Sequence, residues 1–254
     1  MQLHFKESGR GRAVILLHGL FGSSDNWHPI ASKLSGSFHV FALDQRNHGQ
    51  SPHSDEMDYP LMAADVDRFM ASRRLATAFV IGHSMGGKTA MQFALQSQDR
   101  VDKLIVSDMA PRVYAPAHDK IFAALLALDL ELFATRQQIE AALAPEIPNL
   151  VLRRFLLKSL GRDAKGKFAW KMNLRGLSVK YPRLGEMVSA PVPFAKPALF
   201  IRGASDGLVS DAYLKAYAGL LPNARTLTIP AAGHAPHLEQ PEALASAVFE
   251  FLGA

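Results

Sequence analysis

The sequence lacks cysteine altogether, so neither disulfide bonds nor thiolate chemistry can contribute to its stability or function. It also lacks long apolar runs: the stretch 13–17 is short, and Asp129 interrupts the apolar stretch 121–132. A membrane-spanning helix needs about 20 apolar residues, so none is predicted. Residues 1–7 show no apolar core of a signal peptide. These absences predict a cytoplasmic protein without stable membrane association.

Acidic residues are scarce in one part of the chain. The formal net charge is +5, but between residues 153 and 183 ten lysines and arginines stand against the single acid Asp163. The ordinary interpretation is a solvated helix face, and the alternative is a surface that attracts an anionic small molecule. Because this stretch contains no recognisable nucleic-acid-binding motif, no nucleic-acid partner is predicted.

The sequence does contain a regular alternation of apolar, strand-like runs and helical stretches joined by short loops. That alternation is typical of an α/β fold with a mostly parallel central sheet flanked by helices. The predicted strands cover residues 3–6, 13–17, 38–43, 78–82, 101–107, 197–202 and 226–229, and the predicted helices cover 27–34, 60–75, 85–96, 211–220 and 241–252.

The alternation breaks between about residue 112 and residue 190, where the chain is predicted to be mostly helical and no strand is predicted. Linkers rich in glycine or serine are absent at both edges of this block, which argues against a separate domain. We therefore expect one α/β core formed by residues 1–111 and 190–254, with residues 112–189 inserted as a helical lid (cap).

Residues 82–86 read Gly-His-Ser-Met-Gly, the G-x-S-x-G pattern, at the junction of a predicted strand and a predicted helix. A sharp strand-to-helix turn strains the backbone of the central serine and exposes its hydroxyl above the strand ends. Small residues two positions before and after it leave room for the turn. Ser84 is therefore the candidate nucleophile.

A serine nucleophile needs a base, and the base needs an orienting acid. His234 follows a predicted strand and precedes the last predicted helix. Asp206 follows the strand 197–202, and Asp108 follows the strand 101–107. The carboxyl ends of parallel strands line one edge of a sheet, so these side chains can meet over one crevice. Asp206 is the preferred acid, with Asp108 as the alternative.

Four motifs together resemble the α/β-hydrolase family over nearly the whole chain: residues 18–22 (His-Gly-Leu-Phe-Gly), 44–51 (Asp-Gln-Arg-Asn-His-Gly-Gln-Ser), 82–87 and Gly233-His234. The Arg-Asn-His-Gly form of the second motif, and Ser-Asp-Met-Ala-Pro at 107–111, are most similar to the small YbfF-type bacterial esterases and thioesterases.

The resemblance implies a serine hydrolase that cleaves carboxylic esters, or acyl-CoA thioesters, through an acyl-enzyme. In that scheme Ser84 attacks the acyl carbon and His234 is the general base. The backbone N–H groups of Leu20 and Met85 form the oxyanion hole, and Phe21 contacts the substrate. The resemblance implies no metal ion or organic cofactor, and a small-molecule ester or thioester as partner. The chain is expected to be a monomer or a homodimer. The basic stretch 153–183 is then a candidate rim for the nucleotide end of acyl-CoA.

Two other functions stay open on the same scaffold. One is a carbon–carbon bond hydrolase or lyase, because fold does not fix function. The other is a non-catalytic ligand-binding protein, against which the presence of all three triad residues argues. Among the remaining histidines, His18 and His83 are expected to be structural, and His237 is expected in a loop or at the surface. Asp44, Arg46 and His48 are expected to form a network that fixes the loop before Ser51.

Overall fold

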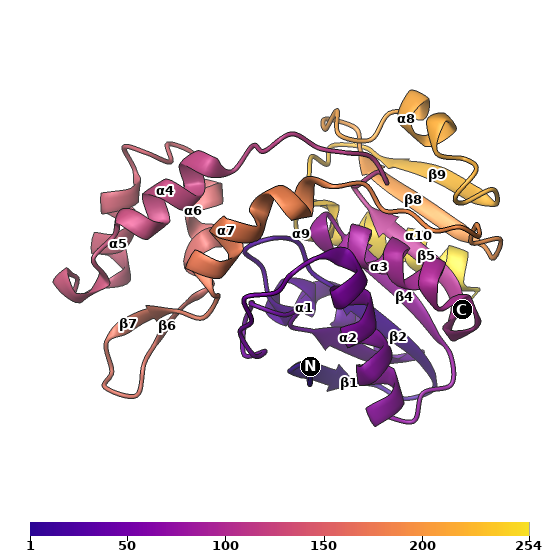
Figure 1. The fold of residues 1–254 in the computed structure, drawn as a ribbon, viewed down its shortest axis with the longest axis horizontal. Coiled ribbons are helices and arrows are strands. Elements are labelled where there is room, and N and C mark those ends of the chain that lie inside the picture. Colours follow the sequence, from indigo (N-terminus) through magenta and orange to yellow (C-terminus); the bar gives the residue numbers. More distant parts are fainter. Residues whose placement is uncertain (254) are drawn as a thin grey trace.

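The computed structural model describes residues 1–253 of the chain. Within these residues the central sheet has seven strands in the order β1-β3-β2-β4-β5-β8-β9, with helices on both sides (Figure 1). β1 pairs antiparallel with β3, and the other pairings in this sheet are parallel. The expected fold class is therefore confirmed. The strands are β1 (Phe5–Ser8), β2 (Arg12–Leu17), β3 (Phe38–Leu43), β4 (Ala78–His83), β5 (Val101–Ser107), β8 (Ala198–Gly203) and β9 (Ala224–Ile229).

The central strands are apolar along their whole length because both faces of the sheet are covered. Alternate residues point to opposite faces. Along β2, Ile15 and Leu17 join the core beneath α2 and α3, whereas Val14 and Leu16 join the core beneath α1 and α10. The polar residues that follow the parallel strands lie together at the edge of the sheet where the carboxyl ends of these strands meet. The helices that cover the sheet are α1 (His28–Leu34), α2 (Tyr59–Ser72), α3 (Met85–Gln96) and α10 (Pro241–Leu252).

Residues 112–189, here called the insertion, leave the sheet after β5 and return before β8, and Figure 1 shows them extending to one side of it. The expectation of helices alone was wrong at one point, because β6 and β7 form an antiparallel hairpin. Three-residue strands are too short to leave a periodic pattern, and the turn between them is closed by the Asp163 side chain and by Gly166 at φ +78°. The elements are α4 (Asp119–Ala127), α5 (Arg136–Leu143), α6 (Leu150–Leu157), β6 (Leu160–Arg162), β7 (Phe168–Trp170) and α7 (Leu174–Gly185).

Several element boundaries also differ from the prediction, and two of these differences are explained by hydrogen bonding. The edge strand β1 begins at Phe5, because its register with β3 starts where Phe5 faces Leu43. Helix α8 (Asp211–Ala216) ends before the expected residue 220, because Ala218 and Leu220 donate to carbonyls three residues earlier and so form tight turns. No helix among residues 1–253 is both long enough and apolar enough to cross a membrane.

Candidate active site

Ser84 occupies the sharp turn between β4 and α3, at φ 52° and ψ −120°. A non-glycine residue in such a conformation costs of order 1–3 kcal/mol and needs support from its surroundings. Glycine is required two residues before Ser84 and two residues after it. A Cβ on Gly82 would lie 2.1 Å from the carbonyl oxygen of Gly86, and a Cβ on Gly86 would lie 2.3 Å from that of Leu17. The G-x-S-x-G pattern thus has the steric origin that the sequence suggested.

The other candidate residues converge on this serine from distant parts of the chain. The hydroxyl of Ser84 lies 3.1 Å from Nε2 of His234, which stands between β9 and α9 (Pro236–Glu239). Nδ1 of the same ring lies 2.7 Å from Oδ2 of Asp108, just after β5, and 3.1 Å from Oδ2 of Asp206, just after β8. Both aspartates named from the sequence therefore reach one imidazole nitrogen.

The two carboxylates differ in their surroundings. Asp108 is fully buried, and burial raises the pKa of its carboxyl to about 6. Asp206 is partly exposed, and the pKa of its carboxyl lies far below its usual value. The largest cause of this lowering is its hydrogen bond with His234. Burial alone would lower the pKa of His234, but the hydrogen bonds with both aspartates outweigh it and raise the pKa to about 9. The cluster therefore stabilises an imidazolium.

Asp108, Asp206 and His234 also form the one group of three potential metal ligands found among residues 1–253, with ligand atoms within 4.8 Å of one another. Nδ1 of His234 already faces both carboxylates, and its Nε2 faces the Ser84 hydroxyl. The arrangement is thus suited to proton transfer from a hydroxyl, with a base that is oriented from behind.

A cavity of about 440 Å³ opens beside these groups. Its wall includes Ser84, His234 and Asp206, and also Leu20 and Met85. Met85 is the first residue of α3, so its N–H has no acceptor within the helix. The expected oxyanion donors thus belong to residues of the cavity wall. A larger groove of about 740 Å³ runs along β9 and α10, and none of these residues lines it.

Phe21 was expected to contact the substrate, but it is buried at 3% exposure and does not line the cavity. Its ring packs against His118 and Phe122, with ring centroids 5.9 and 4.9 Å apart. Of these two, His118 is part of the cavity wall. Phe21 therefore supports a residue that faces the cavity.

The loop that precedes Ser51 is fixed by buried polar groups, as the sequence suggested. The Asp44 carboxylate accepts hydrogen bonds from the N–H groups of Ser24 and Gln50, at 2.6 and 2.8 Å. Nε2 of His18 accepts from the N–H of Gln45 at 3.0 Å. Burial lowers the pKa of His18, so the ring is neutral and its Nδ1–H donates to the Gly19 carbonyl. His18 thus shapes the loop that carries Leu20.

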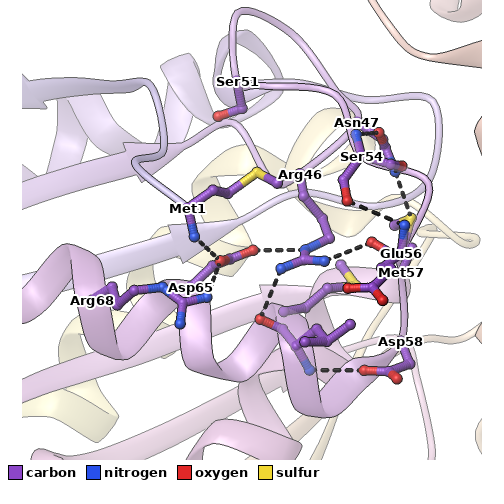
Figure 2. Close-up of polar contacts among 12 residues, drawn as sticks. Met1, Arg46, Asn47, Ser51, Ser54, Glu56, Met57, Asp58, Asp65 and Arg68 are labelled. Atoms are coloured by element: carbon purple, nitrogen blue, oxygen red, sulfur yellow. Dashed lines mark hydrogen bonds and ion pairs between the residues drawn. The ribbon is translucent and has the colours of Figure 1, made fainter.

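Arg46 anchors the same loop to helix α2 (Figure 2). Its Nε donates to Asp65 at 2.7 Å, and a second nitrogen donates to the Glu56 carbonyl at 2.6 Å. Asp65 is 1% exposed and also accepts from Arg68. The sequence interpretation overlooked Asp65, although an acid between Ala63 and Val66 on the apolar face of α2 was a visible signal for a buried ion pair.

Two histidines pack behind His234. Nε2 of His83 lies 2.7 Å from the His234 carbonyl oxygen, which suits the expected structural role. His237 was expected in a loop or at the surface, and this was wrong: it is 2% exposed, with its ring 4.8 Å from Trp27 and 4.4 Å from His83. Pro236 begins α9 there, and both Pro236 and His237 are buried in this short helix. Burial lowers the pKa of both His83 and His237.

Sequence reasoning also overlooked several residues that line the cavity. Tyr114, His118 and Tyr181 belong to the insertion, and Lys88 belongs to α3. Lys88 gave a signal that went unused, because it is the only charged residue of α3 and stands one helical turn after Ser84.

Comparisons with known proteins agree with this fold. The chain matches the Alpha/beta hydrolase family over residues 14–247. It is 37% identical over 240 residues to Esterase YbfF of Escherichia coli (strain K12), covering 94% of this chain and 92% of that protein. It is 33% identical over 248 residues to the mouse sn-1-specific diacylglycerol lipase ABHD11 (Mus musculus), covering 94% and 80%. The solved structure of a marine microorganism esterase superposes with a TM-score of 0.96 at 40% identity, over 98% of this chain and 99% of that one.

Proposed function

This chain belongs to the α/β-hydrolase family, and we propose that it is a carboxylic ester hydrolase that acts through an acyl-enzyme on Ser84. Ester hydrolysis is supported by relatives that are named esterase and diacylglycerol lipase, and by a structural neighbour named esterase. The single observation that carries the serine mechanism is the 3.1 Å contact between the Ser84 hydroxyl and Nε2 of His234.

In the proposed reaction His234 removes the proton of the Ser84 hydroxyl while the oxygen attacks the ester carbonyl carbon. The oxyanion is stabilised by the backbone N–H groups of Leu20 and Met85. His234 then gives its proton to the leaving alcohol, and the C–O bond breaks to leave an acyl group on Ser84. Water, activated by the same imidazole, hydrolyses this acyl-enzyme and frees the carboxylic acid.

We assign the main orienting role to Asp108 and a secondary one to Asp206, which reverses the order expected from the sequence. Asp108 makes the shorter contact with Nδ1 of His234 and has no exposure to water. A buried carboxylate that accepts the Nδ1–H fixes the ring and its tautomer. Asp206 lies farther from the ring and also accepts a hydrogen bond from the Leu208 N–H. Its charge adds to the stabilisation of the imidazolium.

The test of the proposed function is an acyl-length series of nitrophenyl esters with the wild type, Ser84→Ala and His234→Ala. Loss of such a serine or histidine costs on the order of 10⁶ in kcat. Ser72→Ala is the matched control, because that hydroxyl bonds only the Phe69 carbonyl of its own helix. A Ser84→Ala variant that kept wild-type kcat on every ester would refute the mechanism. Cleavage of carbon–carbon substrates with no ester hydrolysis would favour the alternative function.

The insertion is proposed to act as a lid, since Tyr114, His118 and Tyr181 all come from it and line the cavity. Acyl-CoA thioesters are a finer proposal that depends on the basic stretch 153–183. Part of that charge is neutralised by ion pairs that Arg154 and Lys167 form within the insertion. The cations that form no ion pair within residues 1–253 include Lys158, Lys165, Lys171, Arg175 and Lys180.

These side chains do not line the cavity, so they can act only on a part of the substrate that lies outside it. Attraction between exposed charges weakens as salt rises. If the rim receives the nucleotide of acyl-CoA, kcat/KM for acyl-CoA falls more steeply with ionic strength than kcat/KM for a neutral ester. An equal salt response for both substrates would refute the rim.

A further inference from the structure

Lys88 is a charged side chain held almost entirely out of water inside the proposed active site. It lies in the first turns of α3, and its N–H donates to the Ser84 carbonyl at 3.2 Å, so it stands one helical turn from the nucleophile. Its side chain is 1% exposed, and it lines the same cavity as Ser84 and His234. A buried ammonium costs several kcal/mol unless it is paired with an anion.

No carboxylate among residues 1–253 lies within 4.0 Å of the Lys88 ammonium. The Nζ donates to the carbonyl oxygens of Gly185 and Glu186, at 3.2 and 2.6 Å. It also lies 5.4 Å from the ring centroid of Tyr59 and 4.9 Å from that of Tyr114. These partners are dipoles and aromatic faces without a full negative charge. An ammonium has three N–H donors, so one remains after the two carbonyls are served.

The nearest charged neighbours do not neutralise it. The guanidinium of Arg112 stacks on the Tyr114 ring at 4.5 Å. The Glu186 carboxylate, which is exposed, pairs with Arg183 at 3.0 Å. Burial first, and then the positive charge of Arg112, lower the pKa of Lys88 to about 7. The charge of Glu186 has a smaller, opposite effect on this pKa. The cavity wall therefore contains an amine that no carboxylate of residues 1–253 contacts, and a bound anion would favour its charged form.

We propose that Lys88 is a specificity residue that receives a carboxylate on the acyl group of the substrate. The proposal rests on the proposed ester hydrolysis at Ser84 and names its preferred substrates as half-esters of short dicarboxylic acids. Ser84 and Lys88 line one cavity of about 440 Å³. The Cβ atoms of residues one helical turn apart are about 5–6 Å from each other, so an acyl group that links the two side chains within this cavity is short. Succinyl and glutaryl groups have this size.

A purely structural role for Lys88 is the competing explanation. Gly185 is the last residue of α7, and an ammonium at a helix C-terminus is favourable. That role would tie the returning end of the insertion to the helix behind the nucleophile, and a neutral amide could also fill it. A glutamine at position 88 keeps N–H donors for the two carbonyls and removes the charge, so it separates anchoring from charge recognition.

The experiment compares kcat/KM for monoethyl glutarate with kcat/KM for ethyl valerate, which have acyl groups of equal carbon number and release the same alcohol. We expect the wild type to prefer the half-ester and Lys88→Gln to lower the ratio by roughly 10- to 100-fold, the effect of losing a hydrogen bond to a charged group. Lys215→Met, on the exposed helix α8 and outside both the cavity and the basic stretch 153–183, should keep the wild-type ratio.

The outcomes separate cleanly. The inference alone is overturned if the wild type hydrolyses ethyl valerate through Ser84 but shows no preference for the half-ester. It is also overturned if the ratio of kcat/KM values for Lys88→Gln equals that of the wild type. No hydrolysis of either ester overturns the proposed function as well. A preference confined to carboxymethyl butyrate, whose carboxylate is on the alcohol side, overturns the acyl-side assignment. If Lys88→Gln does not fold, inhibition of the wild type decides: glutarate should compete with ethyl valerate more strongly than valerate does, and equal inhibition refutes the proposal.

Discussion

Replacing Asp206 by asparagine removes a negative charge that lies 3.1 Å from Nδ1 of His234 and leaves Asp108 in place. Two unit charges about 4 Å apart interact by about 4 kcal/mol at an effective dielectric constant of 20. The His234 side chain is 42% exposed, so solvent screening reduces this to roughly 1–2 kcal/mol, or about one pKa unit. The pKa of His234 should therefore fall from about 9 to roughly 8.

A general base must be neutral to act, so kcat/KM of the wild type should rise with pH up to about 9. The assay is a pH profile of kcat/KM on a neutral ester between about pH 6 and pH 10. For Asp206→Asn the rising limb should move to lower pH by about one unit, while the plateau changes little. The lower pKa would then make the variant relatively more active near pH 7 than the wild type is there.

Asp108→Asn is the contrasting variant. Its amide can donate to Nδ1 and so favour the tautomer that carries its proton on Nε2, where Ser84 needs an acceptor. The plateau of kcat/KM should fall by about 10³–10⁴. The reverse pattern, with a collapse in Asp206→Asn and a shifted limb in Asp108→Asn, would show that the acid expected from the sequence is the main one. An unshifted limb in both variants would refute the electrostatic reasoning.

Two further predictions concern the scaffold around the site. Gly82→Ala forces a Cβ against a backbone carbonyl, so the free energy of unfolding should fall by about 3 kcal/mol together with activity, whereas Gly36→Ala, with nothing within 4 Å, should leave both unchanged. Urea titrations measure the first effect, and equal stability of the two variants would contradict it. Asp65→Asn leaves Arg46 buried without its counter-ion and should cost about 3 kcal/mol. The pKa of Asp65 is lowered, so its contribution to the free energy of unfolding is present at neutral pH and is lost as pH falls into the acid range. The Arg68 side chain is 54% exposed, so Arg68→Ala should lose much less stability.

Local signals in the sequence were sufficient to predict the position of those candidate site residues whose placement depends on neighbouring residues. The turn at Ser84 was predictable because its glycines and its strand–helix context lie within a few residues of each other. His234 was predictable because it follows a strand and a glycine. The family resemblance added the expected roles of Leu20 and Met85. The fold class followed from the alternation of apolar runs and helices, which is a property of neighbouring residues.

The parts that sequence reasoning missed depend on contacts between distant segments. Asp108 and Asp206 appeared as alternatives because chain order does not reveal that β5 and β8 are adjacent in the sheet. Their strand ends bring both carboxylates to one ring nitrogen. The burial of His237 depends on Trp27, more than 200 residues earlier. Asp65 depends on Arg46, which arrives from the loop after β3. No local pattern encodes such pairings.

The charges around the cavity also give it a direction. Asp206 places a negative charge in the cavity wall beside His234, whereas Lys88 places a positive charge in the wall one helical turn from Ser84. An anionic substituent is repelled at the first position and attracted at the second. A substrate with a carboxylate on its acyl group is thereby turned so that its acyl end faces Lys88 and its leaving alcohol faces the imidazole that must protonate it. The same electrostatic arrangement would thus serve both recognition and the order of proton transfer.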